Sequence, residues 1–425
     1  MLRRSLHLRA SMLFLYNIFI NAYVAAIKLS SFTNKKAAKW ISGRKNLFEK
    51  LQKQITAGDK IIWFHCSSAG ELEQGLPVVE RLNASYPNYK ILITFFSPSG
   101  MEAAAKHKDK YLLSYIPADT KQNAKRFMQI VQPQLAIFVK YEFWYHHLHA
   151  AAFRHVPVLL ISAVFRDDQL FFKRYGNFYK QILFLFRHIF VQDPISLRLL
   201  QHHSIDHCSV GGDTRFDRVL QNAKSFSRLP LIEQFIQNKQ VIVAGSTWAD
   251  DEKLLAALLK NAPDLKLIIA PHETDESHLV ALEKLFGEAV RLSHSIELNN
   301  ISRKILIVDS VGILSRLYRY ATIAYVGGGF TKDGIHNTLE AAVYGKPILF
   351  GPNYKKYREA VDLIEAGGAF SIANAVDLTK NVQNLLTNPD ALMKASSASK
   401  KYGLDNAGAT ENVFNFIQEK RLLTN

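Results

Sequence analysis

The segment HCSSAGE (65–71) holds residue types that could move a proton or bind an anion. Ser67, Ser68 and Gly70 are small, so they permit a tight turn, and backbone N–H groups at a helix start can face an anion. Glu71 follows them and would begin a helix, where the helix dipole stabilises a carboxylate. Glu71 is therefore either a capping residue or a general base that accepts the proton of a hydroxyl.

A second segment, VGGGFTKDGIHNTLEAAVYGKPILFGPN (326–353), combines glycines with a predicted helix start. Glycine lets the backbone approach a ligand closely, and the N-terminus of a helix over GIHNTLEAA (334–342) would suit a phosphate. Asn337 and Glu340 would share one face of that helix. A carboxylate there can accept both hydroxyls of a ribose, although Glu340 could also be an ordinary surface residue. The substrate-binding residues predicted here are Gly328, Gly329, His336, Asn337, Thr338, Leu339 and Glu340.

Two further strand ends carry polar residues. Ser246 and Thr247 stand at a strand-to-helix turn in AGSTWADDE (244–252), where they could cap the helix, bind phosphate, or do both. Pro271 and His272 end another predicted strand. A lone histidine is usually structural, so His272 has both a structural and a ligand-binding interpretation.

A last group of charged residues suits a negatively charged substrate. Lys140 and Glu142 come just after a predicted strand in FVKYEFW (138–144), and Arg215 lies near the predicted domain boundary. Lysine and arginine bind carboxylate and phosphate groups. Surface ion pairs would show the same residue types, so each of these positions is weak evidence when taken alone.

The elements that would position these residues are short apolar strands that alternate with helices. Continuous apolar runs are typical of buried parallel strands, and they are 61–66, 90–96, 135–139, 156–162, 188–192, 241–245, 265–270, 304–309, 322–328 and 347–351. Helices are predicted over 71–83 and 100–106. Such alternation predicts an α/β fold with doubly wound sheets, whose ligands bind at the carboxyl ends of the strands. The pattern weakens over 217–238, which we interpret as a linker between two domains that face a central cleft.

Composition sets the class of protein and of partner. The chain has 425 residues, 48% of them hydrophobic and 21% charged, which indicates two globular domains rather than disorder. Lys and Arg number 53 against 37 Asp and Glu, a formal net charge of +16, so the surface favours anionic partners. Cys66 and Cys208 form no CxxC or zinc-spaced cluster, and both are predicted to be small buried residues.

The N-terminal segment resembles a membrane anchor. No residue from Ala10 to Ile27 is charged, while basic residues stand on both sides. The apolar stretch is slightly short for a bilayer-spanning helix. Asn17, Asn21 and Lys28 would fall on one helical face, which suits a helix lying in the membrane interface. An ordinary first helix packed on the protein is the alternative, and the absence of a small-residue cleavage motif argues against a secretory signal.

Taken together, these motifs resemble those of the 3-deoxy-D-manno-octulosonic acid (Kdo) transferases of lipopolysaccharide biosynthesis. The likeness extends to about residue 365. It rests on the pair Gly43 and Arg44 after the anchor, on H-x-x-S-x-G-E at 65–71, on SPSG (97–100), on GDTRFD (212–217), on the Ser-Thr turn, and on DGIHNTLE (333–340). The resemblance implies a GT-B fold, Glu71 as the catalytic base, and binding of cytidine monophosphate by Asn337 and Glu340.

The chain departs from the family pattern at three places. Lys140 replaces an acidic residue in the E-T-E-x-W-P-N motif, although Glu142 and Trp144 match. His272 follows Pro271 where the family has an arginine that contacts the donor. The family's M-G-E motif reads Val311, Gly312 and Ile313 here, which removes a side-chain contact and leaves backbone contacts possible.

The resemblance further implies the substrates and the location of the enzyme. It implies a CMP-Kdo donor without a metal or other cofactor, a lipid A precursor (lipid IVA) as acceptor, and inversion at the anomeric carbon. Glu71, Lys140, Glu142 and Arg215 would form the catalytic group. The predicted organisation is an N-terminal anchor helix (1–30), an acceptor domain (31–225) and a donor domain (226–425), on the cytoplasmic face of the inner membrane and its anionic surface.

Two rival interpretations remain open from the sequence. A different GT-B enzyme, either a glycosyltransferase with another nucleotide sugar or a related epimerase, would also have the Asn337/Glu340 segment. A basic protein that binds membranes or nucleic acid without catalysis is the other rival. The basic residues are dispersed and no aromatic-interleaved RNA motif is present, so we do not expect a nucleic-acid partner. The oligomeric state is not predicted.

Overall fold

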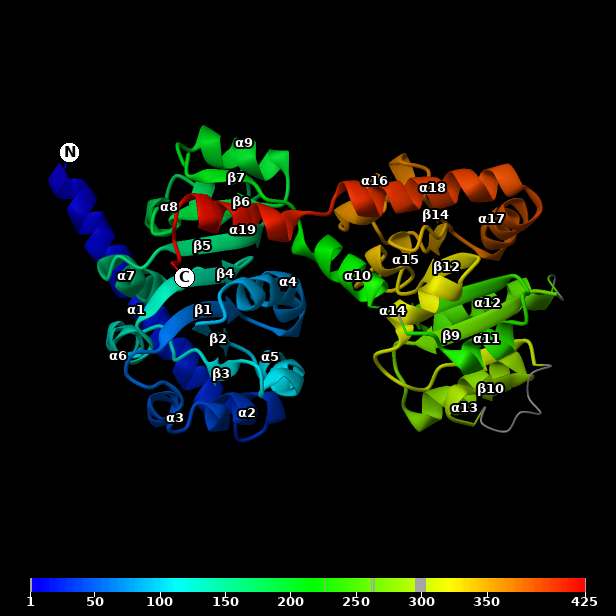
Figure 1. Cartoon of the computed structure of the whole chain (residues 1–425), viewed down its shortest axis with the longest axis horizontal. Coiled ribbons are helices and arrows are strands. Elements are labelled where there is room, and N and C mark those ends of the chain that lie inside the picture. Colours follow the sequence, from blue (N-terminus) through cyan, green and yellow to red (C-terminus); the bar gives the residue numbers. More distant parts are fainter. Residues whose placement is uncertain (1, 226, 261, 263, 295–302, 425) are drawn as a thin grey trace. The chain divides into compact units, whose positions relative to one another are not determined.

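The computed structural model describes residues 2–225, 227–260, 262, 264–294 and 303–424, and the chain forms two compact units. The first unit comprises Met1–Arg218 and Gly408–Asn425, and the second comprises Val219–Ala407. Each unit is built on a parallel sheet with helices on both faces (Figure 1). The predicted α/β class and the doubly wound sheets are therefore confirmed.

The first unit has a seven-stranded sheet of order β3-β2-β1-β4-β5-β6-β7. Its strands are β1 (Lys60–Cys66), β2 (Tyr89–Phe95), β3 (Leu112–Tyr115), β4 (Pro133–Val139), β5 (Val158–Ala163), β6 (His188–Val191) and β7 (Cys208–Val210). Its helices are α1 (Leu2–Ser30), α2 (Lys35–Gly43), α3 (Leu47–Gln54), α4 (Ala69–Ser85), α5 (Pro98–Ala104), α6 (Lys121–Val131), α7 (Tyr145–Phe153), α8 (Asn177–Leu183), α9 (Pro194–His202), the start of α10 (Thr214–Lys224), and α19 (Ala409–Glu419). Short 3-10 turns are η1 (Ala105–His107) and η2 (Leu170–Phe172).

The central strands of this sheet are buried on both sides, as continuous apolar runs require. Trp63 of β1 is fully buried, and its ring centroid lies 4.8 Å from that of Phe127 on α6 and 4.9 Å from that of Phe138 on β4. The indole N–H of Trp63 donates to Thr94 Oγ1 over 2.8 Å, so its polar atom is satisfied. This packing fixes the carboxyl ends of β1 and β4 beside each other.

The second unit, in its described part, has a seven-stranded sheet of order β10-β11-β9-β8-β12-β13-β14. Its strands are β8 (Val241–Thr247), β9 (Lys266–Pro271), β10 (Ala289–Arg291), β11 (Ile305–Ile307), β12 (Ile323–Val326), β13 (Ile348–Phe350) and β14 (Ala369–Ser371). Its helices are the end of α10, α11 (Pro230–Ile236), α12 (Ala249–Lys260), α13 (Glu276–Phe286), α14 (Leu314–Leu317), α15 (Leu339–Ala342), α16 (Arg358–Glu365), α17 (Ala375–Thr387) and α18 (Pro389–Asp405), with 3-10 turns η3 (Leu292–His294) and η5 (Tyr318–Tyr320). Separate apolar clusters fill the two sides of this sheet.

The last helix belongs to the first unit, whereas the sequence pattern predicted that all of 226–425 lies in the second. Figure 1 shows α19, in red, among the elements of the first unit. Val413, Phe414 and Ile417 of α19 are buried in the core of that unit. Asp217 fixes the start of α19, because its carboxylate accepts the backbone N–H groups of Gly408 and Thr410, each over 2.7 Å. The predicted linker over 217–238 also differs, since it contains most of α10 and the whole of α11.

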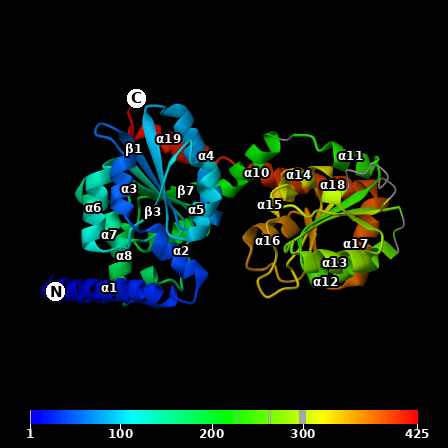
Figure 2. The same cartoon turned by 90° about the horizontal axis from the view of Figure 1, so that it is seen from below.

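Helix α1 lies along the first unit with one face packed on it (Figure 2). Tyr16 and Ile20 are buried, whereas Phe14 and Phe19 on the other face are 65% and 63% exposed. The hydroxyl of Tyr16 donates to Asp119, a buried carboxylate that also accepts the backbone N–H groups of His146 and His147. Both interpretations of this segment therefore hold in part: it packs on the protein and it also presents an apolar face.

Asp119 is the polar centre of this packing. Burial alone would raise the pKa of Asp119, but its hydrogen bonds to His147 and Tyr16 outweigh burial and hold that pKa below the ordinary value.

We expect Asp119→Ala to lower the free energy of unfolding by about 3–5 kcal/mol, because buried donors lose their acceptor. Urea unfolding measures this. The exposed Asp109→Ala should change it by less than about 0.5 kcal/mol, and an equally small effect at Asp119 would contradict the structure.

Candidate active site

Polar residues of the first unit meet where β1 and β4 end. β1 lies between β2 and β4, so the chain connections leave it in opposite directions, and ligands of doubly wound sheets bind at such a point. The turn after β1 contributes Ser67 and Ser68, and the segment after β4 contributes Lys140 and Glu142. The structure therefore places four of the predicted residues at the ends of two adjacent strands.

Glu71 stands in the first turn of α4 and caps it. The backbone N–H of Ser68 donates to Glu71 Oε2 over 2.7 Å, and the Ser68 hydroxyl lies 3.1 Å from the same oxygen. Neither of these hydrogen bonds involves Oε1, and no other from the described residues does. The capping interpretation is thus confirmed, and the geometry leaves one carboxylate oxygen of Glu71 open to a further proton donor.

The electrostatic setting of Glu71 makes it a stronger base than an exposed glutamate. Burial raises the pKa of Glu71, and the nearby charge of Glu142 raises it further. Hydrogen bonds from Ser68 oppose this rise but do not cancel it, so the pKa stays above that of an ordinary glutamate. A carboxylate of raised pKa accepts a proton more readily than an exposed one.

Glu142 itself is held by residues that sequence reasoning did not include in the site. His65 Nε2 lies 3.1 Å from Glu142 Oε2, and Trp144 donates its indole N–H to the same oxygen over 2.6 Å. The other ring nitrogen of His65 lies 2.9 Å from Thr94 Oγ1. His65 is fully buried at the end of β1, so it positions the Glu142 carboxylate from the interior of the unit. The sequence signal that could have placed His65 in the site was its match to the first residue of the family's H-x-x-S-x-G-E motif.

We expect Glu142→Gln to move the acidic limb of the pH profile of kcat/KM to lower pH. The charge of Glu142 raises the pKa of Glu71, so removal of that charge lets Glu71 lose its proton at lower pH. Initial rates measured across pH 5–9 give the profile. Glu102→Gln, an exposed acid on α5, serves as a matched control with an unchanged limb. A limb that stays in place or moves to higher pH would contradict the coupling.

The two basic residues of the predicted catalytic group differ in their surroundings. Lys140 has φ 61°, a conformation that is costly for a residue with a side chain and that clusters at functional sites. Arg215 is held by its neighbour Asp213, since its Nε donates to Asp213 Oδ2 over 2.7 Å. Gln74 also donates to Asp213, over 3.2 Å. Arg215 therefore has a fixed orientation, and its charge is partly neutralised.

The second unit contains a pocket of about 430 Å³ at the carboxyl ends of its central strands. β8 lies between β9 and β12 in this sheet, so the pocket also occupies a point where the chain connections diverge. The residues that line it are Ser246, Ala270, Pro271, His272, Thr274, Ser310, Val311, Gly312, Leu314, Ser315, Tyr318, His336, Asn337 and Glu340. Eight predicted substrate-binding residues are therefore brought together here: Ser246, Pro271, His272, Val311, Gly312, His336, Asn337 and Glu340.

Two of the lining side chains, His272 and His336, belong to a stack of three rings that also includes Trp248. The ring centroids of Trp248 and His272 lie 4.6 Å apart at an interplanar angle of 21°, and those of His272 and His336 lie 4.6 Å apart at 29°. Burial lowers the pKa of His336, and the charge of His272 lowers it further. His336 is thus held in the neutral form, which suits stacking and hydrogen bonding rather than charge neutralisation. Trp248 was not among the predicted site residues.

Asn337 and Glu340 lie together as predicted, but the helix is short. Asn337 donates its side-chain amide to Glu340 Oε1 over 3.3 Å, and its own Oδ1 accepts the backbone N–H of Leu339 over 3.1 Å. Helix α15 has four residues, because the chain turns again at Gly345, which has φ 64°. A single turn has little dipole, so the side chains must supply most of the recognition.

Of the two residues in the Ser-Thr turn, only Ser246 lines the pocket. Its backbone φ is 53°. Thr247 is buried and donates its hydroxyl to Glu252 over 3.0 Å. Helix α12 carries Asp250, Asp251 and Glu252 in its first turn, and these acids already occupy the positive end of the helix. That helix end is therefore a poor phosphate site.

Several predicted residues have a structural role in place of a contact with the pocket. The N–H of Gly328 donates to Asp251 over 2.9 Å, and a Cβ at Gly329 would lie 2.5 Å from the backbone of Gly351. Thr338 and Leu339 are fully buried. The remaining predicted substrate-binding residues outside the pocket lining are Ser67, Ser68, Gly70, Thr247 and Ile313. The part these residues play in substrate binding stays a prediction.

No group of three or more His, Cys, Asp and Glu residues suited to a metal ion occurs among the described residues. The prediction that the reaction needs no metal is not tested by this. Cys66 and Cys208 are free and buried, as expected from their apolar sequence context.

Comparison with known proteins gives a consistent result. The sequence profile of the 3-deoxy-D-manno-octulosonic-acid transferase (kdotransferase) family matches residues 41–218. The 3-deoxy-D-manno-octulosonic acid transferase of Haemophilus influenzae is 26% identical over 376 residues, which cover 84% of this chain and 86% of that protein. The transferase of Aquifex aeolicus is 27% identical over 332 residues, which cover 77% of this chain and 86% of that protein.

The fold has solved relatives. The crystal structure of UDP-GlcNAc 2-epimerase from Neisseria meningitidis, bound to UDP-GlcNAc, superposes with a TM-score of 0.62 at 18% identity. The match covers 85% of this chain and 100% of that chain. At this identity the likeness concerns the fold alone, and with the two parallel sheets it confirms the predicted GT-B class.

Proposed function

Because this chain is a glycosyltransferase of the Kdo transferase family, we propose that it moves Kdo from CMP-Kdo to a lipid A precursor with inversion. The observation that carries the proposal is the half-buried carboxylate of Glu71. It has one uncommitted oxygen and a raised pKa, and it stands at the strand ends where ligands of this fold bind.

The proposed reaction is one displacement. An acceptor hydroxyl oxygen attacks the anomeric carbon of Kdo and forms the new glycosidic bond. The bond between that carbon and the phosphate oxygen of CMP breaks, and CMP leaves with the electron pair. Glu71 Oε1 accepts the hydroxyl proton, while Oε2 stays bound to Ser68 and keeps the carboxylate in place. Lys140 and Arg215 are proposed to offset the negative charge that develops.

The donor is proposed to bind in the pocket of the second unit. Glu340, held by Asn337, accepts the ribose hydroxyls. The hydroxyls of Ser246, Ser310 and Ser315 and the stacked ring of His272 line the same pocket. Hydroxyls and imidazole N–H groups can bind phosphate by hydrogen bonds, so we propose that the reaction needs no metal.

A nucleotide panel tests the donor class. We expect CMP to raise the melting temperature of the protein more than UMP, UDP or UDP-GlcNAc does at equal concentration, because binding to the folded state stabilises it. Stabilisation by UDP-GlcNAc with none by CMP would contradict the proposal and favour an epimerase or a transferase of another sugar.

His272 offers a sharper test of the donor pocket. An arginine carries a positive charge at every working pH, whereas an imidazole carries it only in acid. We therefore expect His272→Arg to tighten CMP binding at pH 8 by about tenfold, since a charged hydrogen bond to phosphate adds about 1.5–3 kcal/mol less the cost of rearrangement. Calorimetry measures the affinity. His202→Arg, exposed on α9, adds the same charge elsewhere and should have no effect; weaker CMP binding at His272→Arg would contradict this placement.

We propose that α1 attaches the enzyme to the cytoplasmic face of the inner membrane and lies in the plane of the interface. The apolar part, Ser11–Ser30, is long enough to cross a bilayer by length and composition. Tyr16, near the middle of α1, contacts Asp119, and Asn17 Oδ1 lies 2.6 Å from His146 Nε2. A crossing helix would carry this polar packing into the hydrocarbon core, which is costly. An in-plane helix immerses only the exposed apolar face.

A further inference from the structure

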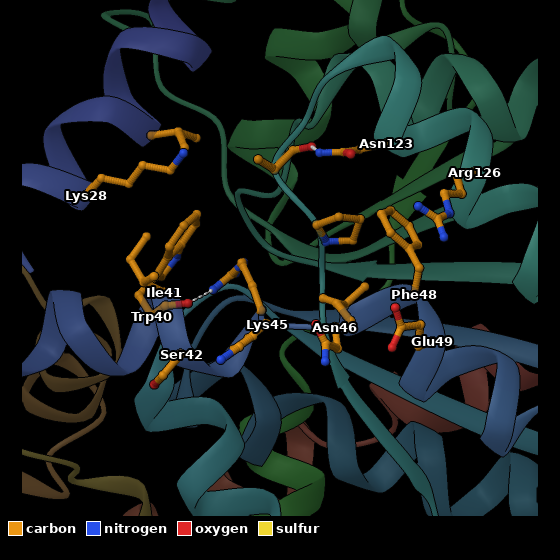
Figure 3. Close-up of a pocket in the computed structure, with 15 residues that line it drawn as sticks. Lys28, Trp40, Ile41, Ser42, Lys45, Asn46, Phe48, Glu49, Asn123 and Arg126 are labelled. Atoms are coloured by element: carbon orange, nitrogen blue, oxygen red, sulfur yellow. Dashed lines mark hydrogen bonds between the residues drawn. The ribbon is translucent and has the colours of Figure 1, made fainter.

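A basic pocket in the first unit lies outside the proposed catalytic sites. It has a volume of about 490 Å³ and lies between the C-terminal part of α1, the α2–α3 turn and the start of α6. The residues that line it are Val24, Lys28, Trp40, Ile41, Ser42, Arg44, Lys45, Asn46, Leu47, Phe48, Glu49, Pro117, Ala118, Asn123 and Arg126. Four of them are basic and Glu49 is the one acid. Figure 3 shows Lys28 and Arg126 on opposite sides of this pocket, with Lys45 between them.

Arg44 gives the pocket a fixed positive charge. Its guanidinium lies 3.7 Å from the ring centroid of Trp40 and 4.7 Å from that of Tyr115. It donates to the backbone oxygens of Trp40, Phe96 and Ile116 over 3.2, 2.8 and 3.0 Å. All these partners are neutral, and the structure records no acid paired with Arg44 in its described part. Burial lowers the pKa of Arg44 to about 9, so the side chain is still charged at neutral pH.

A partly buried cation without an acidic partner is costly, and an anion in the adjoining pocket would offset that cost. The other three basic side chains, Lys28, Lys45 and Arg126, are exposed at the rim, and no described carboxylate forms an ion pair with them. Arg126 lies with its guanidinium 4.4 Å from the ring centroid of Phe48, which restrains it. Glu49 reduces the net charge of the pocket but leaves it positive.

The backbone adds donors on the same wall. Helix α3 begins at the pocket, and its preceding residue Asn46 makes no side-chain capping hydrogen bond. The first N–H groups of a helix have no partner within the helix. Those of Phe48 and Glu49 therefore remain available beside Arg44 and Lys45, an arrangement that suits phosphate oxygens.

The position of the pocket relative to α1 indicates where the anion comes from. Val24 and Lys28 of α1 form part of the lining, and the exposed apolar residues of this region continue past them to Leu29 (71% exposed) and Phe32 (86% exposed). If those side chains enter the bilayer, the pocket lies at the depth of the lipid headgroups. Basic side chains at that level attract anionic lipids.

We propose that this pocket binds the phosphate of an anionic phospholipid headgroup and so fixes the enzyme on the membrane. The phosphate oxygens would face Arg44, Lys45 and Arg126, and the acyl chains would run beside the exposed face of α1. This inference rests on the membrane attachment proposed above, but not on the identity of the transferred sugar.

Flotation of the full chain with vesicles tests the proposal. One set of vesicles contains the phosphate-free lipid digalactosyldiacylglycerol with phosphatidylglycerol, and a second contains digalactosyldiacylglycerol with oleate at matched surface charge. We expect the protein to prefer the phosphate vesicles by about tenfold, since charge-assisted hydrogen bonds to phosphate add to charge attraction. Equal binding to both sets would overturn the pocket as a phosphate site.

Two variants of equal charge locate the site. Lys45→Gln with Arg126→Gln should abolish the preference for phosphate vesicles, because both side chains line the pocket. Lys35→Gln with Lys36→Gln removes the same charge from exposed positions at the start of α2, and should weaken binding to both sets alike while the preference remains. Loss of the preference in both double variants, or in neither, would overturn the assignment.

Two further measurements distinguish a phospholipid from other ligands of the pocket, and distinguish failure of this proposal from failure of the proposed function. Inorganic phosphate that displaces the protein from vesicles at micromolar concentration would show a free-phosphate site, and would contradict a lipid ligand.

CMP release is measured in detergent with the lipid A precursor. If the pocket double variant raises KM for that acceptor and keeps its vesicle preference, the pocket serves the acceptor and the phospholipid proposal is wrong. If the wild type releases no CMP but shows the vesicle preference, only the proposed function fails.

Discussion

Glu71→Gln is expected to lower kcat by about 10²–10⁴-fold and to leave CMP affinity unchanged, because it removes the general base alone. The amide oxygen of glutamine can still accept the backbone N–H of Ser68, as Glu71 Oε2 does. The substitution therefore separates catalysis from helix capping. Initial rates of CMP release and calorimetry with CMP measure the two quantities.

The control for Glu71 is a variant that weakens the cap and keeps the carboxylate. Ser68→Ala removes the hydroxyl 3.1 Å from Glu71 Oε2 but not the backbone N–H. It should lower stability by about 1 kcal/mol and keep most of the activity. If Glu71→Gln keeps near-normal kcat, or if Ser68→Ala loses activity to the same extent, Glu71 is a structural cap and the base lies elsewhere.

Glu340→Ala is expected to weaken CMP binding by about 10–100-fold. A carboxylate that accepts two ribose hydroxyls contributes about 1.5–3 kcal/mol for each charged hydrogen bond, part of which water replaces. Glu340 lines the donor pocket with its oxygen held by Asn337. Isothermal calorimetry with CMP gives the dissociation constant directly.

Glutamine at the same position makes the test more specific. Glu340→Gln keeps one oxygen acceptor and loses the second, so its affinity should fall between those of the wild type and Glu340→Ala. Glu365→Ala, an exposed glutamate on α16 outside the pocket, should bind CMP as the wild type does. Unchanged CMP affinity in Glu340→Ala would remove Glu340 from the donor site.

The sequence predicted the central strands well and missed the outer ones. The four unpredicted strands are β3, β7, β10 and β14, which are the two edges of each sheet. Edge strands are covered less fully, so short segments such as CSV (208–210) and AFS (369–371) need no continuous apolar run. These strands also have only three or four residues, too few for a periodic pattern to be recognised.

The candidate site could be predicted where local sequence determines it. Glu71 follows a strand and small residues, and the structure finds it in the first turn of α4. The pairing of His65 with Glu142 could not be predicted in this way, because it joins residues 77 apart along the chain through the pairing of β1 with β4. The Trp248–His272–His336 stack likewise depends on three separate strand ends.

The position of α19 shows a further limit of sequence reasoning. Its apolar face would have suited either unit. An amphipathic pattern predicts that a helix packs against a core, but it does not identify which core. Asp217, nearly two hundred residues earlier, accepts the N–H groups that begin α19 and so places it on the first unit. No local pattern in 408–425 indicates this partner.

The most direct test of the central claim is mass spectrometry of the acceptor after incubation of the protein with CMP-Kdo and lipid A precursor. The account predicts that the acceptor gains the mass of one Kdo residue for each CMP released, and that Glu71→Gln gives no such product. An acceptor of unchanged mass, with wild-type protein that binds both substrates, would contradict the account.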